Sequence, residues 1–272
     1  MTRTTSRLAA LTVAGAMALA IAGPVAAAED GAHVRVLHGS PDAPSVDVYV
    51  NDARVDALSG LEFGDLSAYV SVPGGTYAIK VCATADPALC PIDVPSIDLA
   101  DGTKYTIAAT NALASIEAQV LVDDPNPTAD ATQVRVVHFS ADTPAVDVLT
   151  QDGATTVVDN LAYPDATEYL SLPAGSYDLK VCADADNTVC PLDPGALDLM
   201  AGTAYSVFAI GSLGAESLTA AVGVEGVAAP ATDTVAPADE APAPAAPILL
   251  IGVIGAAAFV GGLRLATIRA RR

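Results

Sequence analysis

Hydrophobic and polar positions alternate over short stretches through most of this chain. At 46–50, three valines alternate with Asp47 and Tyr49, which is the period-two pattern of a strand with one buried face. Turns rich in Gly and Pro separate such stretches, and no long helical pattern interrupts them. The sequence therefore predicts about seven short strands in the first part of the chain, at 33–38, 46–50, 66–72, 76–83, 97–99, 103–110 and 116–122.

The same pattern returns one hundred residues later. Segments 34–48 and 134–148 agree at ten of fifteen positions. The alignment continues without a gap through Tyr69/Tyr169, Pro73/Pro173, Tyr77/Tyr177, Cys82/Cys182, Cys90/Cys190, Gly102/Gly202 and Tyr105/Tyr205. Because each copy of a duplicated domain must bury its own core, we predict an all-β protein with two tandem Ig/fibronectin-III-like β-sandwich domains, at 29–124 and 125–222.

Two tyrosines in each copy follow a turn that contains glycine. Tyr105 and Tyr205 lie in phrases that resemble the tyrosine corner of fibronectin type III sandwiches, where the phenol caps nearby backbone. Tyr77 and Tyr177 follow a similar turn before each first cysteine. We expect all four side chains to pack at corners. The alternative is an exposed aromatic platform that binds a ligand.

The first 28 residues have the composition of a secretory signal peptide. Arg3 and Arg7 precede an apolar run at 8–22, and alanines occupy 26–28 as a small-residue cleavage site. We therefore expect residues 1–28 to be removed and the rest of the chain to be exported.

The C-terminal part of the chain has a different pattern. Segment 223–247 is rich in Ala and Pro and is expected to form a disordered stalk. Segment 248–268 is mostly apolar and precedes a basic tail at 269–272. Since basic residues stay in the cytoplasm, we predict a transmembrane helix in a single-pass type I orientation, with the N-terminal domains extracellular. A buried core helix is the alternative interpretation.

The charge of the exported part is strongly negative. All 32 acidic residues lie between Glu29 and Glu240, where only six basic residues occur, so the formal charge of this part is −26. Such a field repels nucleic acid and anionic lipid and concentrates cations. We therefore expect no nucleic-acid partner. A solvated, aggregation-resistant surface is the simpler explanation of this charge, and a role linked to a cation is the alternative.

Each copy contains two cysteines with seven residues between them. In an exported chain each pair is expected to close its own loop, Cys82 with Cys90 and Cys182 with Cys190. A loop of about nine residues stabilises the fold by roughly 2.5 kcal/mol in the chain-entropy model. A four-cysteine zinc site would have to join the two copies, and the oxidising compartment argues against it.

The repeated phrase places a histidine, a serine and an aspartate two residues apart, followed by a proline. These residues are His38, Ser40, Asp42 and Pro44 in the first copy and His138, Ser140, Asp142 and Pro144 in the second. A hydrolase triad needs groups that converge in space beside oxyanion donors, and no Gly-x-Ser-x-Gly elbow is present. We expect a turn with no catalytic residue. An extracellular hydrolase that uses His38, Ser40 and Asp42 is the alternative.

Hard oxygen ligands suited to Ca²⁺ occur at two places. Asp42 and Asp47 lie in the first copy, whereas Asp123, Asp124 and Asn126 lie at the junction of the copies. No EF-hand spacing is present, so these residues are weak metal candidates and no cofactor is predicted. A tandem stiffened by Ca²⁺ at the junction, as in an adhesin, is the alternative.

The phrase at 34–50, together with the Val-Pro-Gly-Gly-Thr-Tyr turn at 72–77, resembles a bacterial exported family called domain of unknown function 4397. The resemblance covers both copies and implies a surface or secreted β-rich module without an established active site. The second copy departs from the phrase at Phe139, Ala141 and Leu149, so the two copies could differ in the role of these positions.

These features together predict a non-catalytic binding or structural module of the bacterial cell surface, rather than an enzyme. The expected partners are the membrane, through the C-terminal helix, and an extracellular protein or glycan that the sequence does not identify.

Overall fold

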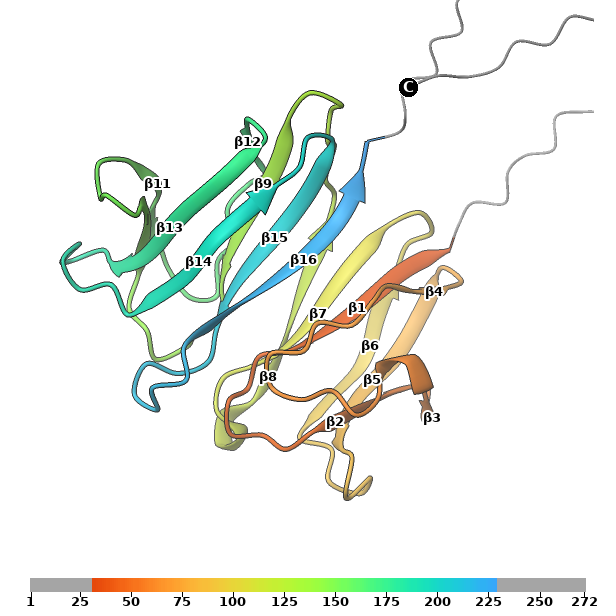
Figure 1. The fold of residues 1–272 in the computed structure, drawn as a ribbon. Coiled ribbons are helices and arrows are strands. Elements are labelled where there is room, and N and C mark those ends of the chain that lie inside the picture. Colours follow the sequence, from red (N-terminus) through yellow and green to blue (C-terminus); the bar gives the residue numbers. More distant parts are fainter. Residues whose placement is uncertain (1–30, 229–272) are drawn as a thin grey trace, which may run out of the picture. The chain divides into compact units, whose positions relative to one another are not determined.

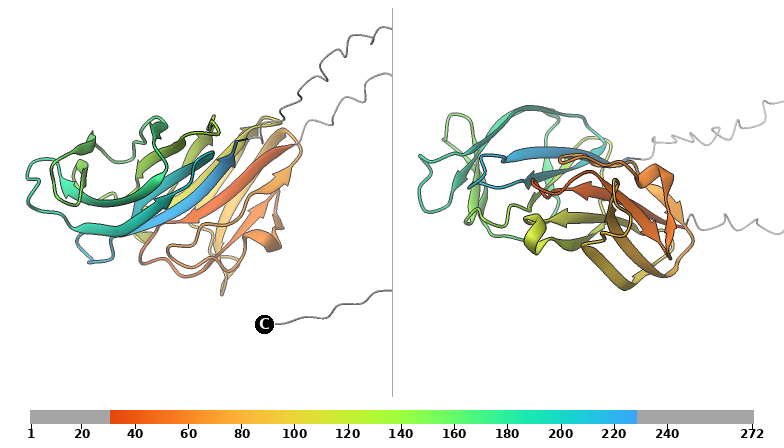
Figure 2. Two further views of the ribbon diagram at one scale, coloured as in Figure 1. Left: turned by 45° about the horizontal axis from the view of Figure 1, so that its top comes forward. Right: turned by 90° about the horizontal axis from the view of Figure 1, so that it is seen from below.

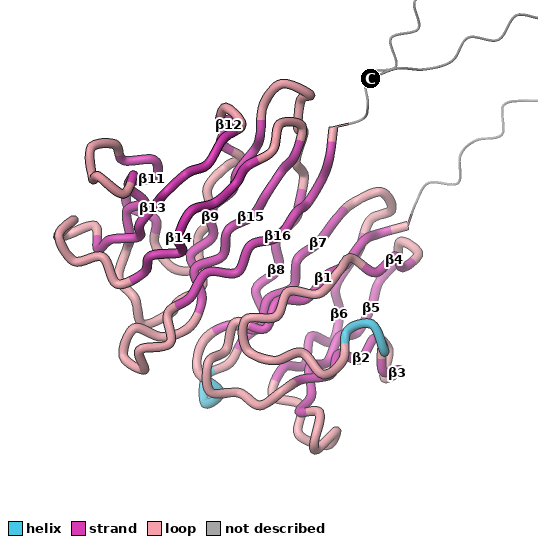
Figure 3. The backbone as a smooth tube through the Cα atoms, in the orientation of Figure 1, coloured by secondary structure: helices cyan, strands magenta, loops and turns pink. Residues whose placement is uncertain are grey.

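A computed structural model of the chain describes residues 31–228, which are built almost entirely from strands joined by turns (Figure 1). The helical segments of these residues are two single turns, η1 (Asp56–Leu58) and η2 (Leu113–Ser115) (Figure 3). A search of residues 31–228 finds no helix with the length and apolar character to cross a membrane. The predicted signal peptide (1–28), transmembrane helix (248–268) and basic tail (269–272) lie outside the described residues.

Each copy of the repeat forms eight strands, which the colours of Figure 2 separate into a red-to-yellow-green copy and a green-to-blue copy. We call residues 31–124 repeat 1 and residues 125–228 repeat 2. The strands of repeat 1 are β1 (Ala32–His38), β2 (Val46–Val50), β3 (Ala53–Arg54), β4 (Val70–Val72), β5 (Gly75–Ala83), β6 (Ile92–Leu99), β7 (Lys104–Thr110) and β8 (Glu117–Asp123). Those of repeat 2 are β9 (Thr132–His138), β10 (Val146–Thr150), β11 (Thr156–Leu161), β12 (Leu170–Leu172), β13 (Gly175–Ala183), β14 (Leu192–Leu199), β15 (Thr203–Ile210) and β16 (Thr219–Val227).

Two four-stranded sheets make up each repeat. In repeat 1 the strand orders are β4-β1-β7-β8 and β3-β2-β5-β6, and in repeat 2 they are β12-β9-β15-β16 and β11-β10-β13-β14. The prediction of an all-β fold in two tandem copies is therefore confirmed. We call β4-β1-β7-β8 and β12-β9-β15-β16 the inner sheets, because they carry the contacts between the repeats that are described below.

The strand order differs from the immunoglobulin order that the sequence suggested. In an immunoglobulin sandwich the first two strands belong to one sheet, whereas here β1 and β2 lie in different sheets. The turn between them carries the chain from one sheet to the other. Strand β1 pairs in parallel with β7, so that Val34 lies opposite Tyr105 and Val36 opposite Ile107.

Most predicted strands occur with small shifts at their ends, and β2 has the predicted bounds. Three differences stand out in repeat 1. Strand β4 contains only the last three residues of the predicted strand 66–72, since Leu66 makes an isolated bridge to Leu37 instead of a continuous ladder. Strand β6 begins at Ile92, five residues before the prediction, and the two-residue strand β3 was not predicted.

Alternating residues of the strands form a separate core inside each sandwich. In repeat 1 the core side chains include Val34 and Val36 from β1, Val48 from β2 and Ile79 from β5, all of them buried. Repeat 2 uses the aligned positions Val134, Val136, Val148 and Leu179. The expectation that each copy buries its own core is thus confirmed.

The central strands of both inner sheets are also buried on their second face. Arg35 and Leu37 alternate with the core valines of β1, yet they are as buried as those valines. A strand that is buried on both faces needs a second layer against it. This layer is the other repeat, because one apolar cluster joins Leu37 and Ala108 of repeat 1 to the following residues of repeat 2: Val137, Phe139, Phe208, Ile210 and Ala221.

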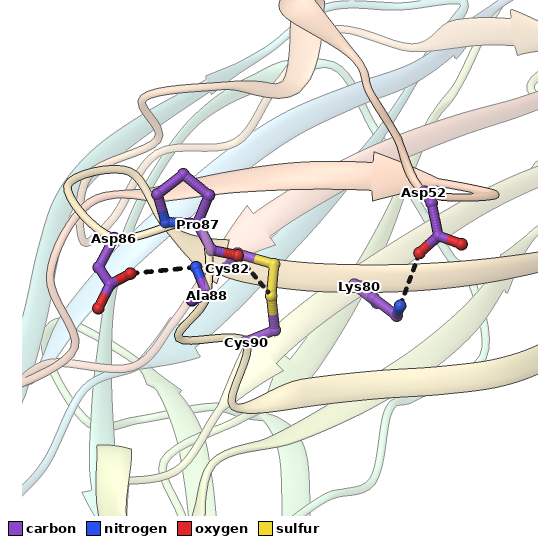
Figure 4. Close-up of a disulfide and its surroundings, with 7 residues drawn as sticks. All are labelled: Asp52, Lys80, Cys82, Asp86, Pro87, Ala88 and Cys90. Carbon is purple, nitrogen blue, oxygen red and sulfur yellow. Dashed lines mark hydrogen bonds and ion pairs between the residues drawn. A yellow bond between two sulfur atoms is a disulfide. The ribbon is translucent and has the colours of Figure 1, made fainter.

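The disulfides and tyrosine corners agree with the sequence analysis. Cys82 is bonded to Cys90, as Figure 4 shows, and Cys182 is bonded to Cys190. The Tyr105 hydroxyl accepts a hydrogen bond from the backbone N–H of Ala100 (3.0 Å). The aligned bond in repeat 2 runs from the N–H of Met200 to Tyr205 (3.2 Å). Tyr77 and Tyr177 donate their hydroxyls to the carbonyls of Pro73 and Pro173, at 2.6 and 2.7 Å.

The C-terminal boundary of repeat 2 differs from the prediction. Strand β16 continues to Val227, so 223–227 belong to the sandwich rather than to the predicted stalk at 223–247. Gly223 and Gly226 interrupt the hydrophobic pattern of this segment, so the sequence did not indicate that the strand continues. A Cβ atom at Gly223 would lie 2.4 Å from Leu66 and 2.5 Å from the Arg35 guanidinium, which explains why this strand position has no side chain.

Candidate functional site

A buried cluster of charged groups lies between the two inner sheets. Its four ionisable members are Arg35 of β1, Arg135 of β9, Asp123 at the end of β8 and Glu225 of β16. The Arg35 guanidinium Nη2 lies 2.6 Å from Glu225 Oε1, and that of Arg135 lies 2.7 Å from the same oxygen. Arg135 also pairs with Asp123. Two positive and two negative charges thus compensate one another where water is excluded.

The cluster repeats the internal symmetry of the chain. In each repeat the arginine Nε donates to a hydroxyl on the neighbouring strand: Arg35 to Thr106 (2.7 Å) and Arg135 to Ser206 (2.9 Å). Each guanidinium lies over a tyrosine ring, with centroid distances of 4.7 Å to Tyr69 and 4.9 Å to Tyr169.

The tyrosine hydroxyls complete the hydrogen bonding of the two carboxylates. Tyr69 donates to Asp123 Oδ2 (2.8 Å), and Tyr169 donates to Glu225 Oε2. Burial raises the pKa of both phenols, and the adjacent carboxylates raise it further. Burial alone would lower the pKa of Arg135, but the charges of Glu225 and Asp123 outweigh it and the net pKa rises. Arg135 therefore stays positively charged and the two phenols stay neutral at physiological pH.

One of the three junctional residues that the sequence offered as Ca²⁺ ligands, Asp123, belongs to this cluster. Both oxygens of Asp123 accept from Arg135, Tyr69 and Thr106, the last at 2.5 Å. Asp124 is exposed, and Asn126 uses its N–H to bond the side chain of Gln133 (2.8 Å). Asp123 therefore bonds side chains of both repeats, whereas Asp124 and Asn126 lie at the surface.

The repeated His-Ser-Asp phrase forms the turn between the first two strands of each repeat. Nε2–H of His38 donates to the carbonyl of Pro44 (3.0 Å), so Nδ1 is the unprotonated nitrogen of the neutral ring. Burial lowers the pKa of His38. Asp42 accepts from the N–H of Leu113 (2.7 Å) and so caps the turn after β7. Ser40 is completely buried.

Repeat 2 builds the same turn with more hydrogen bonds. Asp142 accepts from the N–H groups of Leu213 and Gly214, both at 2.9 Å, and from the hydroxyl of Ser212 (2.7 Å). Burial opposes ionisation of Asp142, but these donors outweigh it and lower its pKa. The Ser140 hydroxyl bonds Thr143 (2.7 Å).

The turn of repeat 1 lacks these serine contacts. Ala43 takes the aligned position of Thr143, and within the described residues His38 Nδ1 and Ser40 Oγ have no hydrogen-bond partner. In both repeats the histidine, serine and aspartate serve the turn and do not form a chain from nucleophile to base to carboxylate.

A second pair of aligned aspartates, Asp47 of β2 and Asp147 of β10, has different surroundings in the two repeats. Asp47 is buried and forms an ion pair with Arg54 (3.0 Å), while the hydroxyl of Thr84 donates to it at 2.9 Å. This aspartate therefore has its charge compensated by the protein.

Asp147 is equally buried but faces other carboxylates. One carboxylate oxygen from each of Asp147, Asp159 and Asp184 lies within 4.8 Å of the others. Burial raises the pKa of Asp184, and the charges of Asp147 and Asp159 raise it further. Asp47 was a weak metal candidate in the sequence analysis, and the structure pairs it with Arg54, whereas the aligned Asp147 forms no ion pair with a basic side chain of residues 31–228.

Comparison with known proteins identifies the repeat. The family model described as Domain of unknown function (DUF4397) matches residues 32–149 and 132–236. The chain belongs to this family. It is a tandem member with one match over each repeat, as the resemblance of the repeated phrase implied.

The remaining comparisons add little to the family assignment. No curated protein matches the chain. Among solved structures, the Bacillus anthracis TIE protein matches with 12% sequence identity and a TM-score of 0.20. That match covers 67% of this chain and 34% of the other, so the chain spans about a third of its length.

Three features of this tandem DUF4397 chain were missed in the sequence analysis. The central arginines were visible as Val-Arg-Val in both copies, a charge between two core valines at a position where a solvent-facing residue was expected. Phe139, one of the departures from the family phrase, packs on Phe208 in the cluster between the repeats. The acidic residues Asp159 and Asp184 replace Ser59 and Thr84 of repeat 1, a difference that aligning the copies could have revealed.

Proposed function

We propose that this protein is a non-catalytic binding or structural module of the bacterial envelope, exported, anchored by its C-terminal segment and displayed on a stalk. The observation that carries the proposal is the use of the repeated polar phrase. Asp42 and Asp142 cap turns, both histidines bond proline carbonyls, and Ser40 and Ser140 are inaccessible to a substrate.

The contact between the repeats supports a mechanical or display role. Four compensated charges and an apolar cluster resist separation of the two sandwiches, because separating them would expose both. A block of this kind presents surfaces at fixed positions, as a binding module for an extracellular protein or glycan requires.

The first experiment distinguishes a non-catalytic module from an extracellular hydrolase. Purified residues 29–228 are assayed against ester, peptide and glycoside substrates, alone and as the Ser40→Ala and Ser140→Ala variants. We expect no turnover that depends on either serine. Serine-dependent turnover would refute the proposal, because a serine buried in a structural turn cannot attack a substrate.

The second experiment tests location and binding. Protease treatment of intact cells should remove residues 29–228 from the membrane fraction and leave a short C-terminal fragment. Residues 29–228 immobilised as bait should retain a protein or glycan from envelope extract, and a bait with the buried Glu225→Ala change serves as the misassembled control. A chain found in the cytosolic fraction would contradict the membrane anchor.

A further inference from the structure

The turn between the last two strands is longer in repeat 2 than in repeat 1. In repeat 1 six residues, 111–116, connect β7 to β8. In repeat 2 Ile210 pairs with Thr219, so eight residues, 211–218, connect β15 to β16. We call residues 211–218 the long turn. Its two additional residues are a difference between the repeats in a surface loop, where binding residues are often found.

A carboxylate of a neighbouring turn holds the long turn in place. Asp142 accepts from the N–H groups of Leu213 and Gly214 and from the hydroxyl of Ser212. Within the long turn, the N–H of Ser217 donates to the carbonyl of Ser212 (3.0 Å). A loop that is ordered before binding loses little conformational entropy when a partner docks. The long turn therefore has the preorganisation that a binding loop needs.

The long turn borders an apolar groove together with loop 184–191, which contains Cys190. The groove has a volume of about 230 Å³ and is lined by Pro191, Leu213, Glu216 and Leu218. Leu213 is 38% exposed, and Val189 in loop 184–191 is 53% exposed. Large apolar side chains that stay exposed beside a groove are typical of a surface that a partner covers.

Repeat 1 uses the equivalent apolar residue in its core. Ile116, the last residue before β8, packs against the core of repeat 1. Leu218 is the last residue before β16, but it lines the groove and is not among the described residues that pack against the core clusters of repeat 2. The longer turn thus coincides with the transfer of an apolar side chain from the core to a surface groove.

The groove lies at the end of β16 that is opposite the C-terminal end of the sandwich. Strand β16 starts directly after the long turn and runs to Val227, and Figure 1 shows these two ends of the strand far apart. In the proposed function the segment after Val227 leads to the membrane anchor. The groove then faces away from the membrane, and in this respect the inference rests on the proposed function.

The loops around the groove carry only negative charge. Turn 139–145 bonds the long turn through Asp142, and it contacts loop 184–191 because the N–H of Asp184 donates to the carbonyl of Ala145 (3.0 Å). These three segments contain four acidic residues and no lysine, arginine or histidine. Their field attracts a cationic partner and repels an anionic lipid surface. A positively charged partner therefore complements this end of repeat 2.

We propose that the groove at Pro191, Leu213, Glu216 and Leu218 binds a cationic peptide segment of another protein. One large apolar side chain of the segment fills the groove, and an adjacent lysine or arginine of the segment pairs with the exposed Glu216. The four lining residues include no aromatic ring and only one hydrogen-bonding side chain. They therefore suit an apolar side chain better than a sugar, which needs several polar partners.

The ligand class is tested by panning a random-peptide display library on the immobilised full chain in mild detergent. We expect enrichment of sequences in which Leu, Met or Phe lies next to Lys or Arg. The most enriched peptide is then labelled, and its Kd is measured by fluorescence anisotropy. Raising the salt from about 0.05 M to about 0.5 M should weaken binding several-fold, because salt screens exposed charges. No enrichment, or enrichment of sequences without a basic residue, would overturn the proposal.

Three variants localise the site. Leu213→Ser changes an exposed side chain and should raise the Kd of the peptide at least about tenfold, as the loss of an apolar anchor does. Glu216→Gln should raise the Kd about three- to tenfold at low salt and remove most of its salt dependence. Leu113→Ser, at the aligned position of repeat 1, should leave the Kd unchanged. Circular dichroism and Tm verify that each variant is folded. An equal Kd for the unchanged chain and Leu213→Ser would overturn the proposal.

Two further probes distinguish a peptide ligand from other classes. Vesicles of phosphatidylcholine with phosphatidylglycerol, and soluble cell-wall polysaccharide, are tested on the unchanged chain and on Leu213→Ser. Binding of either probe that depends on Leu213, without peptide enrichment, would overturn the assignment of a peptide ligand. Serine-dependent turnover would refute the proposed function itself. An envelope partner that the unchanged chain and Leu213→Ser retain equally would refute only the groove.

Discussion

The two repeats share a fold and differ in the faces that they turn toward each other. Repeat 1 contributes Gly39 and Ala108 where repeat 2 contributes Phe139 and Phe208. At two other positions the larger side chain belongs to repeat 1, where Leu66 and Leu121 correspond to Ala166 and Gly223 of repeat 2. Large side chains on one face thus meet small ones on the other.

This size difference makes the contact between unlike repeats better packed than a contact between like ones. Two copies of the repeat 2 face would bring four phenylalanine rings together, and two copies of the repeat 1 face would leave voids. A Cβ atom at Gly39 would approach Ile210 Cγ2 to 3.3 Å, so the space left by this glycine is used by the other repeat. The comparison teaches that the two copies keep separate cores but have evolved unlike, complementary faces toward each other.

The strongest test of this comparison removes the carboxylate that both arginines share. Glu225→Ala should lower the free energy of unfolding by about 3–5 kcal/mol, because it leaves two buried guanidiniums with one carboxylate between them. Urea unfolding followed by circular dichroism measures this loss. Glu168→Ala, at an exposed position of the same repeat, should change the value by less than about 0.5 kcal/mol. Equal effects of the two variants would show that the cluster does not join the repeats.

A second test compares the two disulfide loops. Both loops have the same sequence separation of 8, so Cys82→Ala/Cys90→Ala and Cys182→Ala/Cys190→Ala should each cost about 2.5 kcal/mol. Thermal unfolding of both double variants checks the equality, and mass spectrometry after thiol alkylation checks the pairing. A disulfide between the repeats would contradict it.

The histidines of the two turns make stability depend on pH. Burial lowers the pKa of His38 and His138 below the ordinary value of 6.5. As the pH falls below 6.5 the unfolded chain takes up protons before the native state does. Stability is therefore complete above pH 6.5 and decreases toward lower pH, by at most about 1.4 kcal/mol per pH unit for each histidine.

The two histidines should also differ in the pH at which they take up a proton. Protonation of His138 at Nδ1 breaks the bond that it accepts from the N–H of Ser140 (3.3 Å), whereas Nδ1 of His38 has no partner. In an NMR titration we expect His138 to take up its proton at a lower pH than His38. The reverse order would mean that the serine N–H contact has no energetic weight.

The smallest expected effect comes from completing the turn of repeat 1. Ala43→Thr supplies the hydroxyl that Thr143 supplies in repeat 2, and it should raise the free energy of unfolding by about 0.5–1.5 kcal/mol by bonding Ser40. Thr143→Ala should lower it by a similar amount. Chemical unfolding curves of both variants give the two values, and a loss of stability on Ala43→Thr would argue that the turns are not equivalent.

Local patterns were sufficient to predict much of this protein. The offset of one hundred residues located both copies, and the alternation at 46–50 gave the bounds of β2. The spacing of Cys82 and Cys90 gave the disulfide, and the glycine before Tyr105 gave the corner. The strand, the disulfide loop and the tyrosine corner each form between residues that are close in sequence. The residues that cause each feature therefore also make up the pattern that predicts it.

Contacts between distant segments decided the rest. The sequence contained Arg35 and Glu225, but only the packing of the inner sheets brings these residues, 190 positions apart, to hydrogen-bond distance. In the same way Asp159 and Asp184 form a cluster with Asp147 because β10 lies between β11 and β13. A buried aspartate can lie beside an arginine or among other carboxylates. Tertiary structure alone assigns Asp47 to the first case and Asp147 to the second.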